Sequence, residues 1–229
     1  SFDEKNYNTL ANQGNNLPSR HLYFKEVVSW TDLTTRGLTA RYFPQGYVFD
    51  VSGHSTFYNS KEDLLGVLGL LNLKLSNELS KVINPTLHFQ VGDFRKLAYL
   101  KEFINHSDTH SLVQQCIDIS KEDWDSRETS WDFTKNELLK HNLDSKIETA
   151  YNNYCSYWKE KFYKLHANEE ELNRLFIDIY ELGDELTPDV ALKDITILKS
   201  ESIINEDKNI EFKADEIMKQ FISYAVGVM

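Results

Sequence analysis

Apolar residues recur at helical spacing through residues 60–84, and this is the clearest secondary-structure signal in the chain. Leucine and valine fall three or four positions apart, so one face of a helix would be apolar along the whole segment. Ser60 precedes two acidic residues, which suits the start of a helix, and Asn84-Pro85 suits its end. The pattern predicts one long helix that packs into the core.

The residues before this helix, 22–60, form short runs rich in aromatic and β-branched residues, separated by turn signals. Pro44 fixes φ and Gly46 tolerates a positive φ, so the runs on either side of PQG are expected to pair as a hairpin. A further strand, TLHFQV, is expected at 86–91. The expected strands before the helix are LYFKEVVSW, ARYF, GYVFDV and STFYN.

From about residue 101 the apolar spacing is helical. Residues 147–182 are long enough for two packed helices, with a break expected at Ala167-Asn168 and a stop at Gly183. We therefore predict an α+β fold, with a mixed β-sheet domain and its packed long helix over residues 1–100 and an all-helical region over 101–229. The apolar ending MKQFISYAVGVM indicates a fragment of a larger protein, because natural termini are usually polar.

Charge is distributed unevenly along the chain, which carries a formal net charge of -11 over 229 residues. Residues 1–100 hold 10 Lys and Arg against 9 Asp and Glu, which leaves 15 and 27 for residues 101–229. Acidic surfaces repel phosphates, so a polyanion is expected to approach only the first part. The sequence has no apolar stretch of 18 residues, no signal pattern and no cysteine framework, which favours a cytoplasmic protein without a membrane partner.

Motifs for catalysis are missing: the sequence has no Gly-rich phosphate loop, HExxH, CxxC or GxSxG. His54 and Ser55 are neighbours, but on a strand they would face opposite sides and could not act as a nucleophile and its base. His106 and His110 would share one helical face, but two ligands do not make a metal site. We expect no catalytic residue and no metal in this chain.

The segment SWTDLTTRGLTAR, at 29–41, combines hydroxyl groups, two arginines and a flexible glycine, Gly37. Hydroxyl and guanidinium groups suit phosphates and base edges, although an ordinary loop has the same composition. Arg41 has a second interpretation, as a strand residue that pairs with Asp50. Together with other residues of the same half, the candidate DNA contacts are Arg20, Lys25, Thr31, Thr34, Thr35, Arg36, Arg41, His54, Arg95 and Lys96.

Several runs resemble the target-recognition domain of type IIG restriction-modification enzymes and of the BREX phage-defence adenine methyltransferases. They are HLYFKEVVSWT, ARYFPQGYVFDVSGHSTF and the stretch from LLGVLG to FRKL. The resemblance continues through ISKEDWDSRETSWDF, YWKEKFYKLHANEEELNRLFIDIYELGDELTPDV and KADEIMKQFISYAVGVM, so that it covers nearly the whole chain. The resemblance implies the DNA site-recognition region of an N6-adenine methyltransferase, whose partners are double-stranded DNA and a methyltransferase domain of the same parent chain.

In that family the methyltransferase domain binds S-adenosylmethionine and flips an adenine into an Asn-Pro-Pro-Tyr pocket. Neither this motif nor a glycine-rich cofactor motif occurs in the present sequence. The resemblance therefore implies that this chain alone is not an enzyme and holds no cofactor, while its parent methylates adenine. Whether the parent also cleaves DNA is left open.

Two other classes of function stay open. A complete small nuclease would need clustered carboxylates for Mg²⁺, and plasmid cleavage by the chain alone would reveal it. An acidic protein-interaction scaffold would use the charge of residues 101–229, and a lack of DNA affinity at low salt would favour it.

Overall fold

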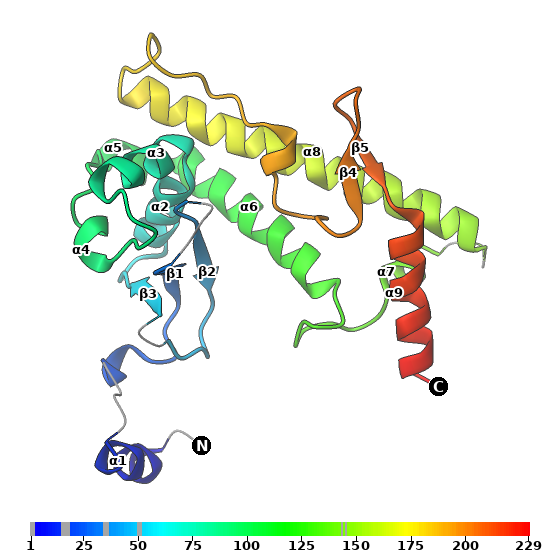
Figure 1. Ribbon diagram of the computed structural model, residues 1–229, viewed down its shortest axis with the longest axis horizontal. Helices are drawn as coiled ribbons and strands as arrows, with labels where there is room; N and C mark the ends of the chain where they lie inside the picture. The colour runs from blue at the N-terminus through cyan, green and yellow to red at the C-terminus, as the bar shows by residue number, and fades with distance from the viewer. Residues whose placement is uncertain (1–2, 15–18, 34–36, 50–51, 143, 145) are drawn as a thin grey trace. The chain divides into compact units, whose positions relative to one another are not determined.

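The computed structural model describes residues 3–14, 19–33, 37–49, 52–142, 144 and 146–229 (Figure 1). The chain folds as two compact units, Ser1–His106 and Ser107–Met229, which we call unit 1 and unit 2. Both units contain helices and antiparallel strands, so the predicted α+β class is confirmed.

Unit 1 combines a three-stranded sheet with short helices and one apolar helix, α2, that contacts two of the strands. Its elements are α1 (Glu4–Asn12), the 3-10 helix η1 (Arg20–Leu22), β1 (Val27–Thr31), β2 (Ala40–Phe43), β3 (Gly53–Thr56), α2 (Lys61–Asn72), α3 (Lys74–Ile83), α4 (Val91–Phe94) and α5 (Lys101–Ile104).

Strand β1 lies at the centre of the sheet, in the order β2-β1-β3, and both pairings are antiparallel rather than mixed. The hairpin expected between ARYF and GYVFDV is wrong for the described residues, because β2 is an edge strand and residues 46–49 do not form a strand. The last two residues of GYVFDV lie outside the described ranges. Gly46 does take a positive φ, of 107°. Its N–H donates to the Phe24 carbonyl at 3.1 Å, and Phe24 N–H donates to the Tyr47 carbonyl at 2.9 Å, so the turn closes on the residues before β1.

The two faces of the sheet differ because side chains alternate along each strand. Val28 and Trp30 on β1 are 0% and 3% exposed, and the Trp30 ring packs at 5.0 Å from the Phe94 ring of α4. The opposite face carries polar side chains and is partly open to solvent. We call this the open face, and its polar residues are Ser29, Thr31, Arg41 and Ser55.

The single helix predicted over residues 60–84 is in fact two helices, α2 and α3. Its start was predicted correctly, since the Ser60 hydroxyl accepts a hydrogen bond from Asp63 N–H at 3.0 Å. The break lies at Leu73, whose backbone is extended and whose side chain is 3% exposed, so this leucine stays in the core. Val82, expected in the core, is 80% exposed because α3 is less buried than α2.

Two asparagines of these helices form hydrogen bonds with the backbone at the start of β2 and just before it. Ala40 N–H donates to Asn72 Oδ1 at 3.0 Å, and Asn72 Nδ2 donates to the Ala40 carbonyl at 3.0 Å. Leu38 N–H donates to Asn77 Oδ1 at 3.1 Å. Gly37 has a φ of 91°, and a Cβ there would lie 2.0 Å from Asn77 Oδ1. This glycine is needed for a close approach and a left-handed backbone, not for flexibility.

Residues 86–89, which we call the strap, do not form the expected strand. Within the described ranges, this segment makes one isolated bridge, between Leu33 and His88, and Val91 already begins α4. Phe89 N–H donates to the Asp32 carbonyl at 2.8 Å, and the Phe89 carbonyl accepts from Trp30 Nε1 at 2.8 Å. The Phe89 carbonyl, which would accept a backbone N–H in a regular sheet, therefore accepts from a tryptophan side chain instead.

Unit 2 is mainly helical, with α6 packed along α8 around a core that includes Trp158 and Phe162. The expectation of an all-helical region is wrong in one place, because Asn205 and Asn209 close a turn between two paired strands. The elements are α6 (Ser107–Asp125), α7 (Glu137–Lys140), α8 (Ile147–Ile179), η2 (Leu192–Asp194), β4 (Ser202–Ile204), β5 (Ile210–Phe212) and α9 (Ala214–Gly227).

Helix α8 runs without a break for 33 residues, so the break expected at Ala167-Asn168 is wrong. Asn168 is 2% exposed, and its side-chain amide lies 3.4 Å from Gln115 Oε1 on α6. The asparagine thus packs between two helices instead of ending one.

The stop expected at Gly183 is also wrong, because α8 ends in a left-handed residue that is not glycine. Glu181 has a φ of 55°. Its N–H donates to the Asp178 carbonyl at 3.3 Å, and Leu182 N–H donates to the Ile177 carbonyl at 2.9 Å, which is the Schellman pattern. A Cβ in this conformation costs roughly 1–2 kcal/mol.

Glu181→Gly is therefore expected to raise the free energy of unfolding by about 0.5–1 kcal/mol, since glycine loses more chain entropy but avoids the Cβ strain. Urea unfolding of the chain measures this change. Gly183→Ala is the control, because a Cβ at this position has no atom within 4 Å. A lower midpoint for Glu181→Gly would contradict the strained end.

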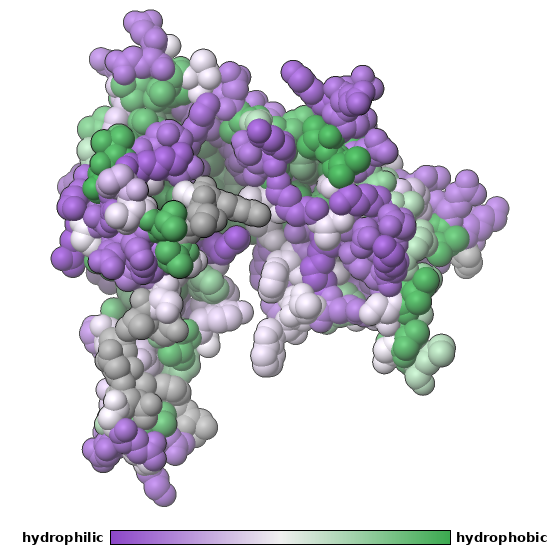
Figure 2. Space-filling view, viewed as in Figure 1, coloured by the Kyte–Doolittle hydropathy of each residue, from purple (hydrophilic) through white to green (hydrophobic). Residues whose placement is uncertain are grey.

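Helix α9 carries exposed apolar side chains towards its end, which form green surface in Figure 2. Ile222 and Val226, one helical turn apart, are 61% and 66% exposed. No helix in the described parts of the chain has both the length and the apolar composition needed to cross a bilayer.

Candidate nucleic-acid interface

All ten candidate DNA contacts belong to unit 1. Thr34, Thr35 and Arg36 lie outside the residues that the structure describes. The structure places the other seven on different parts of unit 1: two lie on the open face, one lies on the buried face of the sheet, and four lie outside the strands.

Thr31 and Arg41 share the open face, and both are exposed. Ser29 stands opposite Arg41 on β2 and opposite Ser55 on β3, so hydroxyl groups and a guanidinium group lie side by side across the strands. The Ser29 hydroxyl donates to the His54 carbonyl at 2.9 Å. The alternative pairing of Arg41 with Asp50 falls on a residue outside the described ranges.

A pocket of about 340 Å³ opens on the same face. Val27, Phe43 and Gly53 of the sheet line it together with Ser29 and the chain segment 47–49. The rings of Phe43 and Tyr47 meet edge to face at 5.7 Å, and Tyr47 is 50% exposed. Apolar walls beside hydroxyl and guanidinium groups suit the mixed surface of a nucleotide, whose methyl groups and ring faces are apolar.

His54 lies on the other face of the sheet, beside Trp30, in a cluster that the sequence analysis missed. His54 Nε2 is 3.2 Å from Asp32 Oδ1, and His88 Nδ1 is 2.8 Å from Asp32 Oδ2. The hydrogen bond from His88, with a smaller contribution from His54, holds the pKa of the Asp32 carboxyl below its usual range. We call Asp32, His54, His88 and Thr86 the histidine edge.

A second pocket, of about 230 Å³, adjoins this edge. Its polar lining includes Lys81 and Asn84 near the end of α3 together with Thr86 and His88 of the strap. Lys81 forms an ion pair with Glu78 at 2.7 Å. Asn84 Oδ1 accepts hydrogen bonds from the N–H and the hydroxyl of Thr86, at 3.1 and 2.7 Å, and so orders the strap next to the pocket.

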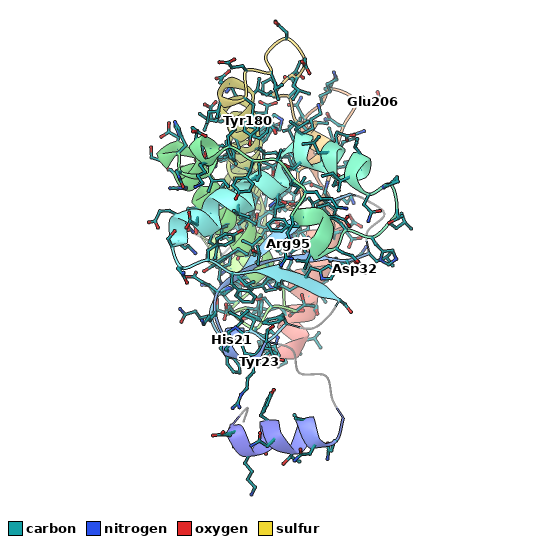
Figure 3. The ribbon with its side chains drawn as sticks, turned by 90° about the vertical axis from the view of Figure 1, so that its left-hand side faces the viewer. His21, Tyr23, Asp32, Arg95, Tyr180 and Glu206 are labelled. Carbon is teal, nitrogen blue, oxygen red and sulfur yellow. The ribbon has the colours of Figure 1, made fainter. Side chains whose placement is uncertain are left out.

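The other four candidates do not join the open face. Arg20 lies 4.2 Å above the Tyr7 ring, and Lys25 is exposed just before β1. Arg95 and Lys96 follow α4, and Lys96 pairs with Asp93 at 3.1 Å (Figure 3 labels Arg95 and Asp32). Their role as DNA contacts stays a prediction.

Metal sites need several donor side chains close together. In the described parts of both units, no group of three or more His, Cys, Asp or Glu side chains could hold a metal ion. The weak signal that could have revealed the histidine edge is a carboxylate at the end of a strand, Asp32, but many surface aspartates share that position.

Comparison with known proteins gives the class of the chain. No family model matches it. Over about nine-tenths of its length, however, the chain is homologous to one segment of adenine-specific methyltransferases, so the family resemblance is confirmed.

Two relatives carry this result. The adenine-specific methyltransferase PglX of Lacticaseibacillus casei (strain Zhang) is 36% identical over 209 residues, and the adenine-specific methyltransferase BrxX of Escherichia coli O9:H4 (strain HS) is 31% identical over 217 residues. These regions cover 89% and 93% of this chain but 16% and 18% of the relatives. The chain therefore corresponds to a PglX/BrxX-like segment and spans less than a fifth of either protein.

Proposed function

We propose that unit 1 is the part of an adenine-specific DNA methyltransferase that recognises the DNA site, and that double-stranded DNA binds at the open face. The observation that carries the proposal is the row of Ser29, Thr31, Arg41 and Ser55 beside an apolar pocket. An enzyme that extrudes an adenine must hold the rest of the duplex. The Arg41 guanidinium and the Thr31 hydroxyl can donate to phosphates and base edges. The Ser29 and Ser55 hydroxyls, which already donate to backbone carbonyls, can accept.

The charge of the two units supports this assignment. Unit 1 holds 11 Lys and Arg against 10 Asp and Glu, whereas unit 2 holds 14 against 26. Phosphates are repelled by the second surface and not by the first. In this proposal S-adenosylmethionine binding and methyl transfer belong to other parts of the polypeptide, which the relatives' greater length makes room for.

Arg41→Ala is expected to weaken binding of a short fluorescent duplex by about fivefold to tenfold at low salt, since losing a charged hydrogen bond costs roughly 1 kcal/mol or more. The slope of log affinity against log salt should fall by about one, because one phosphate contact is lost. Fluorescence anisotropy with the chain at several salt concentrations measures both quantities.

Lys159→Ala is the matched control, because it removes one exposed positive charge from unit 2. We expect it to change the affinity little. Equal losses for the two variants would show that Arg41 acts only through net charge, and the open face would then be wrongly assigned. A wild-type chain that binds no duplex at the lowest salt would refute DNA recognition itself.

A further inference from the structure

The Asp32 carboxylate determines how His88 presents its second ring nitrogen. His88 Nδ1 lies 2.8 Å from Asp32 Oδ2, and an ionised carboxylate can only accept, so Nδ1 carries the proton of the neutral ring. The lone pair is then on Nε2. The His88 side chain is 52% exposed, and its N–H donates to the Thr86 hydroxyl at 3.2 Å, so both backbone and ring are held in place. Nε2 is a preoriented acceptor on the surface.

The electrostatic surroundings of His88 favour a donor as its partner. Asp32 stays ionised near neutral pH because hydrogen bonds from the two histidines lower its pKa. With neutral His54 and His88 the edge carries one negative charge. Among the described residues that line the adjoining pocket, the charged side chain is Lys81, and it is paired with the Glu78 carboxylate. The ionised Asp32 carboxylate therefore favours an N–H donor over a phosphate at His88.

In the major groove, the amino groups of adenine and cytosine are the donors, while guanine and thymine present acceptors there. We infer that His88, oriented by Asp32, accepts a hydrogen bond from the exocyclic amino group of an adenine or a cytosine and so helps to select the DNA site. This inference rests on the proposed function. The strap pairs with Asp32 and Leu33, which directly follow Thr31 of the open face. Both surfaces therefore meet at the end of β1.

The tautomer of His88 can be tested without DNA. Nitrogen NMR of the imidazole in the wild-type chain, at a pH where the ring is neutral, should show the proton on Nδ1. In Asp32→Asn the side chain offers a donor as well as an acceptor, so Nδ1 is no longer obliged to hold the proton, and the share of the tautomer with the proton on Nε2 should rise. A wild-type ring with its proton on Nε2 would overturn the inference.

Selection from a pool of randomised duplexes tests the contact itself. At pH about 8, the wild-type chain should enrich adenine or cytosine at a position where His88→Ala shows no preference, and Asp32→Asn should shift that position towards guanine or thymine. Preferences at other positions should persist in both variants, and thermal unfolding should show that both remain folded. An unchanged preference in His88→Ala overturns the inference.

The sign of the pH dependence separates this contact from a phosphate contact. If His88 accepts from a base, protonation removes the acceptor, and wild-type affinity should fall severalfold as the pH drops while His88→Ala shows a smaller change. Tighter binding at low pH that depends on His88 would indicate a protonated imidazole on a phosphate and overturn the inference. A wild-type chain that binds no duplex would instead refute the proposed function, and this inference with it.

Discussion

Replacing Arg127 by methionine should lower the free energy of unfolding of the chain by roughly 3–5 kcal/mol, the cost of removing one partner from a buried ion-pair network. Arg127 Nη2 lies 2.7 Å from Asp123 Oδ1, and Nη1 pairs with Glu201, whose side chain is 3% exposed. The Tyr154 hydroxyl donates to the same Glu201 carboxylate at 2.8 Å. Methionine is similar in length but leaves both carboxylates buried without a cation.

The loss of stability in Arg127→Met should depend on pH. Burial raises the pKa of Asp123 even beside Arg127, and loss of the guanidinium removes the opposing effect. A carboxyl whose pKa is raised in the folded state favours folding while it is protonated. The loss in free energy of unfolding caused by Arg127→Met should therefore be small at about pH 4–5 and grow as the pH rises. Urea unfolding of the variant and of the wild-type chain, at this low pH and at a higher pH, measures the change. Arg174→Met is the control, since Arg174 is 49% exposed and pairs with Glu171 at the surface. Equal stabilities of the two variants at high pH would contradict the buried network.

The second large effect is expected from Gly66→Ala, which should destabilise unit 1 by roughly 1–3 kcal/mol through overpacking. Helix propensity alone predicts the opposite sign, because alanine favours a helix over glycine by about 1 kcal/mol. A Cβ at Gly66 would lie 2.2 Å from the Ile104 carbonyl oxygen and 2.7 Å from its Cγ2. A backbone carbonyl cannot rotate away as a flexible side chain can, so α2 and α5 would have to separate.

Gly92→Ala, in α4 of the same unit, is the matched control for Gly66→Ala. A Cβ at Gly92 has no atom within 4 Å, so this substitution should be neutral or slightly stabilising. Urea unfolding gives the free energies, and amide hydrogen exchange should show protection lost in α2 and α5 only for Gly66→Ala. If Gly66→Ala is as stable as the wild-type chain, the close approach of α2 and α5 is refuted.

Local features of the fold could be predicted from the sequence. Ser60 caps α2 as expected, and the apolar residues of α2 are buried. In each case the signal and the structure involve residues only a few positions apart, where propensity and periodicity act.

Features that depend on distant partners could not be predicted. Asp32 and His88 are 56 positions apart, and no local pattern indicates that the strap returns to the end of β1. Asn168 has a side chain that disfavours a helix interior, but its place between α6 and α8 overrides that preference. The pairing of β2 with β1 likewise depends on the buried side chains of the sheet, not on the turn at Pro44 and Gly46.

The amide of Asn72 has a consequence for self-association. Strand β2 lies at the edge of its sheet, and edge strands with open N–H and C=O groups can pair with another copy of the chain. Both backbone groups of Ala40 are already bonded to Asn72, whose side chain imitates a peptide group. Helix α2 thereby closes the start of this edge, so unit 1 can expose a short sheet with less risk that neighbouring molecules add strands and aggregate.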